Sequence, residues 1–241
     1  MRGRVLILAG TGLARRVCAA VAGLDVLASL AGVTDRPIDL GVPTRVGGFG
    51  GEDGFRDALR GVAAVLDATH PFAARMSGRA ARVCGDLGVP YLRLTAAPWN
   101  AEPGWTRHAT VEDAAAALPI GARVLLTTGP GSLEPFQGRG LTLWCRRIDP
   151  APPMPGVTWI IGTPPFSQGA EVDLMRRHAI THLVTKNSGG DRAKLDAARA
   201  LGLAIHVIDR PAAPPGEETH DIDRATAFVR AHARQLADHP D

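Results

Sequence analysis

The chain has 241 residues, of which 45% are hydrophobic and 21% charged, and its formal net charge is +3. This composition is typical of one large or two small globular domains and excludes a disordered chain. The weak positive charge, without a basic run and with only 5% aromatic residues, argues against a nucleic-acid-binding protein. No apolar run is long enough to cross a membrane and no signal peptide is visible, so we expect a cytoplasmic protein without membrane contact.

The three cysteines, Cys18, Cys84 and Cys145, are widely spaced within apolar patterns. They form neither a disulfide framework nor a set with metal-ligand spacing. We therefore predict reduced core thiols and no metal site.

The chain opens with a predicted strand, a glycine turn and a helix within residues 4–16. Val5 to Leu8 is a continuous apolar run, which indicates a strand buried on both faces, as in a parallel sheet. Glycines let the backbone approach a phosphate, and the helix N-terminus offers it free N–H groups. The pattern favours a dinucleotide site as much as a common turn without ligand. The predicted contacts are Gly10, Thr11, Gly12, Leu13 and Ala14.

A second buried strand is predicted over residues 24–33, and the loop after it holds Thr34, Asp35 and Arg36. An acidic residue here favours NAD, whereas an arginine suits the extra phosphate of NADP. Arg36, assisted by Thr34, inclines the prediction toward NADP. The alternative is an ion pair within the turn.

Four glycines surround Phe49 after a short strand that begins at Thr44. Such a loop indicates positive φ angles or close backbone approach, and the alternative is a flexible connection to a helix over residues 52–60. We expect Gly47, Gly48, Phe49 and Gly50 to line the cofactor site.

The motif DATHPFA, residues 67–73, follows a buried strand over residues 62–66. Open α/β sheets bind ligands at this carboxyl end, so Thr69 and His70 are candidate cofactor-binding residues. Pro71 predicts the start of a helix that runs to about residue 87. Arg75 lies in its first turn, where a cation is unfavourable unless an anion is near. The alternative is a solvated basic face with Arg79 and Arg82.

The remaining chain is predicted to alternate strands and helices after a linker over residues 95–106. The fold class is therefore α/β, with two Rossmann-like domains whose parallel sheets face a central cleft. We place the domains at residues 1–96 and 97–241. The predicted strands are 91–94, 123–127, 141–145, 157–161, 182–185 and 203–208, and the later helices are 111–118, 168–178, 194–201 and 221–236.

The segment VTKNSGGDRAK, residues 184–194, follows another buried strand and contains Lys186 and Lys194, the two lysines of the chain. A site that needs a compact, titratable ammonium cannot use arginine, which makes Lys186 a candidate functional residue. Asn187 and Ser188 add hydrogen-bonding groups. The alternative is a capped helix start with incidental lysines.

Together these motifs resemble the precorrin-6A reductase family. The resemblance is carried by LAGTG near the start, GGFGG at 47–51, DATHPFA, TTGPGSLEPF at 127–136, and TKNSGG at 185–190 followed by RP at 210–211. It implies an NADPH-dependent reductase of cobalamin biosynthesis that delivers hydride to the double bond between carbons 18 and 19 of a precorrin. It also implies NADPH and the tetrapyrrole in the cleft between two Rossmann-like domains.

The resemblance assigns the N-terminal domain to NADPH and gives the C-terminal domain a share of the tetrapyrrole, a polycarboxylate. Candidate substrate-binding residues are Arg75, Lys186, Asn187, Ser188 and Arg192. His70 and Lys186 are candidate catalytic proton donors, and water is an equal alternative. The oligomeric state stays open, with a monomer as one option, as does hand-over to neighbouring pathway enzymes.

Two other functional classes also fit two α/β domains. A nucleotide-sugar transferase would need no nicotinamide, and a nucleotide-binding module would bind NADPH without turnover. A short-chain dehydrogenase is excluded, because the single tyrosine, Tyr91, is followed four residues later by Thr95 rather than by lysine.

Overall fold

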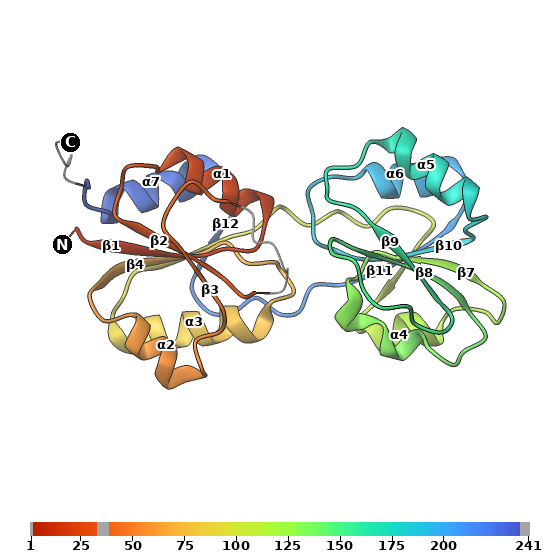
Figure 1. Cartoon of the computed structure of the whole chain (residues 1–241), viewed down its shortest axis with the longest axis horizontal. Coiled ribbons are helices and arrows are strands. Elements are labelled where there is room, and N and C mark those ends of the chain that lie inside the picture. The colour runs from red at the N-terminus through yellow and green to blue at the C-terminus, as the bar shows by residue number, and fades with distance from the viewer. Residues whose placement is uncertain (1, 33–38, 237–241) are drawn as a thin grey trace. The chain divides into compact units, whose positions relative to one another are not determined.

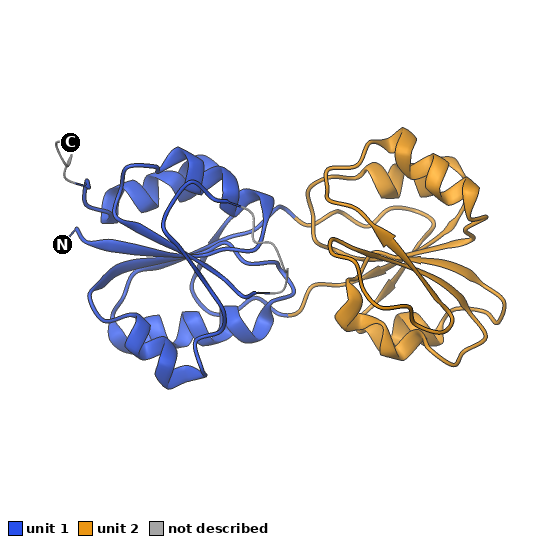
Figure 2. Cartoon of the chain, in the orientation of Figure 1, with its two compact units in different colours: residues 1–97, 212–241 blue, residues 98–211 orange. Residues whose placement is uncertain are grey.

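The computed structural model describes residues 2–32 and 39–236. These divide into two compact units (Figure 2). Unit 1 comprises Met1–Ala97 and Ala212–Asp241, and unit 2 comprises Pro98–Pro211. In each unit a parallel sheet has helices on both faces (Figure 1), which confirms the predicted α/β class with two Rossmann-like domains.

The sheet of unit 1 has six parallel strands in the order β12-β5-β4-β1-β2-β3. Read from β3, this is the doubly wound order of dinucleotide-binding folds, with β12 in the place of the sixth strand. The helices are α1, α2, α3 and α7. The strands are β1 Arg4–Leu8, β2 Val26–Leu30, β3 Thr44–Val46, β4 Val62–Asp67, β5 Tyr91–Leu94 and β12 Glu217–Thr219, and the helices are α1 Gly12–Ala20, α2 Glu52–Ala58, α3 Ala74–Leu87 and α7 Ile222–His232.

Strand β1 is apolar throughout because its two faces enter two different cores. Val5 and Ile7 pack with side chains of α1 and α7, whereas Leu6 and Leu8 pack with those of α2 and α3. Figure 1 shows these helix pairs on opposite faces of the sheet. The continuous apolar run of the sequence is therefore that of a central parallel strand buried on both faces, as predicted.

The sheet of unit 2 has the order β6-β11-β10-β7-β8-β9, and all of its strand pairs are parallel. Read from β9, the first five strands repeat the order of unit 1, and β6 takes the sixth place. Helices α5 and α6 cover one face and α4 the other (Figure 1). The strands are β6 Trp105–His108, β7 Arg123–Leu126, β8 Thr142–Arg147, β9 Val157–Ile161, β10 His182–Lys186 and β11 Ala204–Ile208; the helices are α4 Val111–Ala116, α5 Gln168–Arg177 and α6 Ala193–Ala200, with 3-10 turns η1 Pro130–Ser132 and η2 Glu134–Phe136.

The predicted C-terminal domain, residues 97–241, differs from the structure at its end. Residues 212–241 belong to unit 1, whereas the first predicted boundary lies one residue from the observed one. Strand β12 pairs with β5, and α7 buries Ala225 and Val229 in the core that contains β1. The apolar face of α7 has the same periodicity whichever core it enters, so the sequence pattern alone did not indicate its partner.

Two edge strands were missed by the sequence analysis. Strand β6 overlaps the end of the predicted linker over residues 95–106, and β12 was assigned no structure. Both are short, and β12 is a polar edge strand of three residues, so neither shows a strand periodicity. Helix α3 begins at Ala74 rather than at Pro71, because residues 70–73 form a turn in which Ala73 N–H donates to the His70 carbonyl at 2.8 Å.

Strand β6 brings a buried histidine pair into unit 2. His108 Nε2 and His206 Nδ1, on the neighbouring strand β11, lie 2.9 Å apart, and the His182 ring lies 5.7 Å from that of His206. Burial, and after it the charges of the neighbouring His108 and His182, lower the pKa of His206 to about 4. One nitrogen of the 2.9 Å contact must accept a hydrogen bond, so the pair is incompatible with two fully protonated rings.

We expect the stability of unit 2 to fall as the pH decreases from about 6.5 to about 4. In this window the unfolded chain protonates His206, with an ordinary pKa near 6.5, while the folded state resists protonation. The loss at pH 5 relative to neutral pH is about 2 kcal/mol from this residue. Urea unfolding as a function of pH measures it, and His206→Phe should flatten the pH dependence. An equal slope in the variant and the wild type would contradict this interpretation.

Candidate functional site

The turn between β1 and α1 is attached to the end of β4. Thr11 is the N-cap of α1: its hydroxyl accepts from the Ala14 N–H at 3.2 Å and donates to the Ala68 carbonyl at 3.0 Å. Gly10 faces the backbone of the β4 turn, since a Cβ built on it would lie 3.9 Å from Thr69 Cα. The Thr11 side chain therefore holds the turn against the end of β4.

The N-terminus of α1 is open on the side that a ligand would use. A Cβ on Gly12 would meet no atom within 4 Å, and the first turn contains no acidic residue. Among the described residues, the N–H groups of Gly12 and Leu13 have no acceptor. Leu13 and Ala14 direct their side chains to the core, so only their main chain remains for a cofactor. Thr34 and Arg36 lie outside the described residues.

Side-chain contacts hold the glycine-rich loop at residues 47–51 in a defined turn. The Arg45 guanidinium lies 4.1 Å from the centre of the Phe49 ring and donates to the Gly48 carbonyl at 2.9 Å. Phe49 also makes an edge contact with Phe55 of α2, with ring centres 4.9 Å apart. Gly47 and Gly50 have φ angles of 113° and 73°, which glycine adopts readily. The glycines thus present bare backbone, while Phe49 packs on α2.

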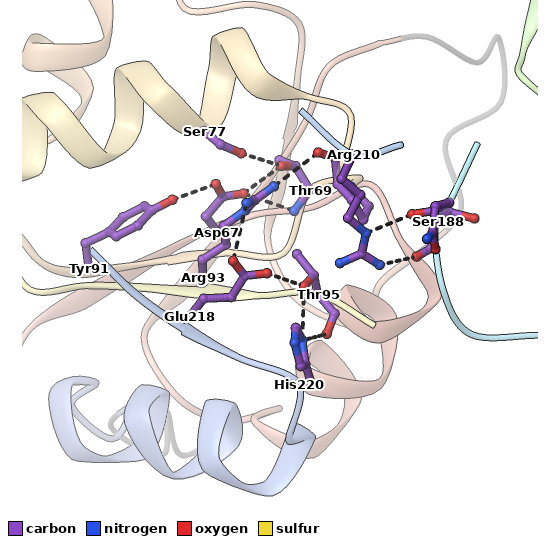
Figure 3. A network of polar contacts seen from close by, with 12 residues as sticks. Asp67, Thr69, Ser77, Tyr91, Arg93, Thr95, Ser188, Arg210, Glu218 and His220 are labelled. Carbon is purple, nitrogen blue, oxygen red and sulfur yellow. Dashed lines mark hydrogen bonds and ion pairs between the residues drawn. The ribbon is translucent and has the colours of Figure 1, made fainter. Parts of the chain in front are cut away.

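A buried carboxylate organises the motif after β4. Asp67 is fully buried and accepts three hydrogen bonds: from the Thr69 N–H at 3.1 Å, the Thr69 hydroxyl at 2.7 Å and the Tyr91 hydroxyl at 2.8 Å (Figure 3). Ser77 of α3 lies 3.1 Å from the same threonine hydroxyl. Burial, followed by the negative charge of Asp67, raises the pKa of Tyr91, so the phenol stays a donor. The network fixes Thr69 beside Gly10.

A second cluster of polar side chains lies at the same end of the sheet and includes Glu218 of β12. Arg93 donates to the Pro71 carbonyl at 3.3 Å and forms an ion pair with Glu218 of β12 at 3.6 Å. The Thr95 hydroxyl bonds Glu218 and lies 3.2 Å from His220 Nδ1 (Figure 3). Strand β12 therefore supports the loop that contains His70.

Sequence reasoning missed most of this network. Asp67 enters the sequence analysis only as the first residue of the motif DATHPFA, and its neighbours Tyr91, Ser77 and Glu218 lie outside that motif. A carboxylate at the end of a buried strand was the available signal, because a buried charge needs donors. Which residues would supply those donors depends on the pairing of β4, β5 and β12.

The candidate residues His70, within this motif, and Arg75, just after it, are exposed. His70 Nδ1 accepts from the Phe72 N–H at 3.2 Å, which places the proton of the neutral ring on Nε2. Arg75 lies in the first turn of α3, which has neither a side-chain cap nor an acidic residue. Arg79 and Arg82 of the predicted basic face instead bond the Gly51 carbonyl and Glu52.

In unit 2, Lys186 is the last residue of β10 and is half-buried. Its ammonium donates to the Thr128 carbonyl and to the Ser132 hydroxyl, both at 2.8 Å. Burial lowers the pKa of this ammonium below its ordinary value. Lys186 therefore joins the end of β10 to the loop after β7, and it releases a proton more readily than an exposed lysine.

The side-chain amide of Asn187 bonds the backbone of Trp99 within unit 2. Its amide oxygen accepts from the Trp99 N–H at 2.8 Å, and its amide nitrogen donates to the Trp99 carbonyl at 3.0 Å. Arg210 donates to the carbonyls of Asn187 and Ser188 at 2.7 and 2.9 Å (Figure 3). The segment TKNSGG thus bonds the beginning of unit 2 at Trp99, and Arg210 of the RP motif in turn bonds TKNSGG.

Arg192 is also engaged within unit 2. It forms an ion pair with Glu102, and its guanidinium lies 5.6 Å from the centre of the Trp105 ring. Arg192 and Asn187 thus have partners within unit 2, and their contact with substrate stays a prediction.

Two further observations concern only residues 2–32 and 39–236. No three histidine, cysteine, aspartate or glutamate side chains gather there as metal ligands. No helix in these ranges has both the length and the apolar character of a membrane span. The three cysteines are buried free thiols, as predicted.

Comparison with known proteins identifies the family. A family model described as Precorrin-6x reductase CbiJ/CobK matches residues 4–230. The precorrin-6A reductase of Rhodococcus erythropolis is 43% identical over 96% of this chain and 99% of its own length, and that of Rhodobacter capsulatus is 42% identical over 95% and 96%. A solved structure titled CobK precorrin-6A reductase matches with a TM-score of 0.89 and 39% identity over 96% of this chain and 97% of that one.

The chain therefore belongs to the precorrin-6x reductase family and is an oxidoreductase of cobalamin biosynthesis. This confirms the family predicted from the motifs. It also decides among the three functional classes considered from the sequence, in favour of the reductase over a sugar transferase or a binding module.

We expect Thr69→Val to lower the free energy of unfolding by about 2 kcal/mol, because it removes a buried hydroxyl that bonds a carboxylate. Thr44→Val is the matched control: its hydroxyl bonds only the Val42 carbonyl at the surface, so the change should stay within about 0.5 kcal/mol. Urea denaturation measures both. Equal effects of the two substitutions would show that the Asp67 network adds no stability.

Proposed function

We propose that this protein catalyses the NADPH-dependent reduction of precorrin-6A to precorrin-6B, with hydride delivered to the double bond between carbons 18 and 19. The observation that carries the proposal is the near-full-length identity of 43% to a precorrin-6A reductase. Bound NADPH would supply the hydride, so the protein has to bind and orient the cofactor and the substrate and to protonate the substrate.

The metal-free precorrin is favoured over its cobalt complex as substrate. Relatives named precorrin-6A reductase are 37–43% identical to this chain. Relatives named cobalt-precorrin-6A reductase are 27–33% identical to it. The difference in similarity supports a metal-free substrate for this chain.

The residues at the start of α1 fit a dinucleotide phosphate. The unpartnered N–H groups of Gly12 and Leu13 and the open space over Gly12 suit a pyrophosphate, which also interacts favourably with the helix dipole. The fit supports NADPH on unit 1 over residues 10–14, with its adenosine end near Thr34 and Arg36. The loop 47–50 and the Thr69–His70 turn would border the rest of the cofactor.

The tetrapyrrole carboxylates require cations, and the geometry supports Arg75 and Lys186 as candidates. Arg75 is exposed at an uncapped helix start, where an anion would offset the unfavourable dipole. Ser188 remains a candidate because its side chain is only partly buried. Unit 2 would contribute to this part of the site.

Proton delivery has three candidates. The lowered pKa of Lys186 makes its ammonium the better acid, the imidazolium form of His70 would be the second donor, and water is the third source. We place the protein in the cytoplasm, where its three free thiols would stay reduced. A monomer and hand-over of product to neighbouring enzymes remain predictions.

The activity is tested by following NADPH oxidation with purified precorrin-6A. We expect NADPH to be oxidised only in the presence of precorrin-6A, and faster than with the cobalt complex of precorrin-6A. NADH should replace NADPH poorly. A protein that binds NADPH but oxidises none of it in the presence of precorrin-6A would overturn the proposal.

The role of Lys186 is tested by Lys186→Arg, with Lys194→Arg as the matched control, since these are the two lysines of the chain. Arginine stays charged at every accessible pH, so Lys186→Arg should lower kcat at least about tenfold and remove the alkaline limb of its pH profile. Lys194→Arg should keep both. An unchanged kcat in Lys186→Arg would assign the proton to His70 or water.

A further inference from the structure

We propose that unit 2 contains a pocket that binds one carboxylate-bearing arm of the tetrapyrrole through Arg147. The inference rests on the proposed function for the identity of the ligand. The pocket has a volume of about 690 Å³ and lies between the loop after β7 and the connection from β8 to β9. None of the site residues predicted from the sequence lines it.

The fold puts this pocket at a position where such sheets bind ligands. By strand order, β7 and β8 of unit 2 correspond to β1 and β2 of unit 1. The connections after these strands carry the proposed cofactor site in unit 1. In unit 2 the same two connections supply the pocket walls, with Gly131 and Leu133 from the first and residues 151–155 from the second. Ligands of open α/β sheets bind at this carboxyl edge.

Arg147 supplies a cation with no acidic partner among the described residues. It is the last residue of β8, and its Nε, like that of Arg146, is buried without a hydrogen-bond acceptor. The preceding residue, Arg146, uses two nitrogens to bond Glu171 at 2.6 and 2.8 Å. Adjacent strand residues point to opposite faces, so one arginine is neutralised and the other is available to an anion.

The walls of the pocket suit an apolar arm that ends in a carboxylate. The Trp159 ring lies 5.3 Å from the Arg147 guanidinium, and its indole N–H donates to the Pro152 carbonyl at 2.8 Å. Gln137 contacts the sulfur of Met154 at 3.4 Å. These contacts hold the proline-rich wall in place, and an aromatic face beside an arginine matches a pyrrole ring with an acidic side chain.

One acidic residue, Glu134, also lines the pocket, and its side chain is exposed. Its negative charge would repel a carboxylate, although solvent screens the repulsion. Two residues of the same pocket therefore have opposite expected effects: loss of Arg147 weakens binding, and loss of the Glu134 charge strengthens it.

The test uses Arg147→Met, Arg147→Lys and Glu134→Gln, with Arg139→Met as the matched control, since Arg139 is exposed nearby and does not line the pocket. We expect Arg147→Met to raise the KM for precorrin-6A about tenfold while the KM for NADPH stays unchanged. Arg147→Lys should recover part of the loss, and Glu134→Gln should lower the KM about twofold. A KM for precorrin-6A in Arg147→Met equal to that in Arg139→Met would overturn the proposal.

Equilibrium dialysis with uroporphyrin, an octacarboxylate tetrapyrrole, separates this inference from the proposed function, because it needs no turnover. Weaker binding to Arg147→Met than to Arg139→Met supports the pocket even if precorrin-6A is not reduced. Two results would overturn the assignment to a tetrapyrrole arm. One is equal binding of uroporphyrin to Arg147→Met and Arg139→Met, and the other is binding of ADP, instead of uroporphyrin, that depends on Arg147. Circular dichroism verifies that each variant is folded.

Discussion

The pairing of β1 between β2 and β4 is the constraint on which unit 1 depends. Both faces of β1 are buried, and both of its edges are used by parallel neighbours. Its carboxyl end therefore delivers the glycine turn next to the end of β4, where Thr11 bonds the Ala68 carbonyl and Gly10 faces Thr69. Two motifs more than fifty residues apart become one surface, and the open start of α1 belongs to it.

Charged side chains of opposite sign, one buried and one half-buried, end equivalent strands in the two units. Asp67 ends β4, and Lys186 ends β10, which holds the same place in the sheet of unit 2. Each charge is satisfied by groups of neighbouring segments: hydroxyl and N–H donors for the carboxylate, a carbonyl and a hydroxyl for the ammonium. A buried charge without such partners would be costly, so each of them orders the loop beside it.

The chain passes between the units twice, and each passage supplies an edge strand. After β5 it provides β6 at the edge of unit 2, and after β11 it returns as β12 beside β5. Unit 1 is therefore complete only when the segment after Pro211 has folded onto it. Glu218 then reaches Arg93 and Thr95, so the support of the His70 loop depends on the last part of the chain.

The sequence by itself determined the α/β class, the central strands, the first domain boundary and the family, because buried parallel strands are long apolar runs and the glycine motifs are specific strings. Only the tertiary structure decided where α7 packs, which donors surround Asp67, and that Asn187 and Arg192 bond Trp99 and Glu102. It also decided that Arg147 lines a pocket whereas Arg146 binds Glu171. An apolar face or a charged side chain in a sequence does not specify its partner, because the partner is set by strand order and by contacts between distant segments.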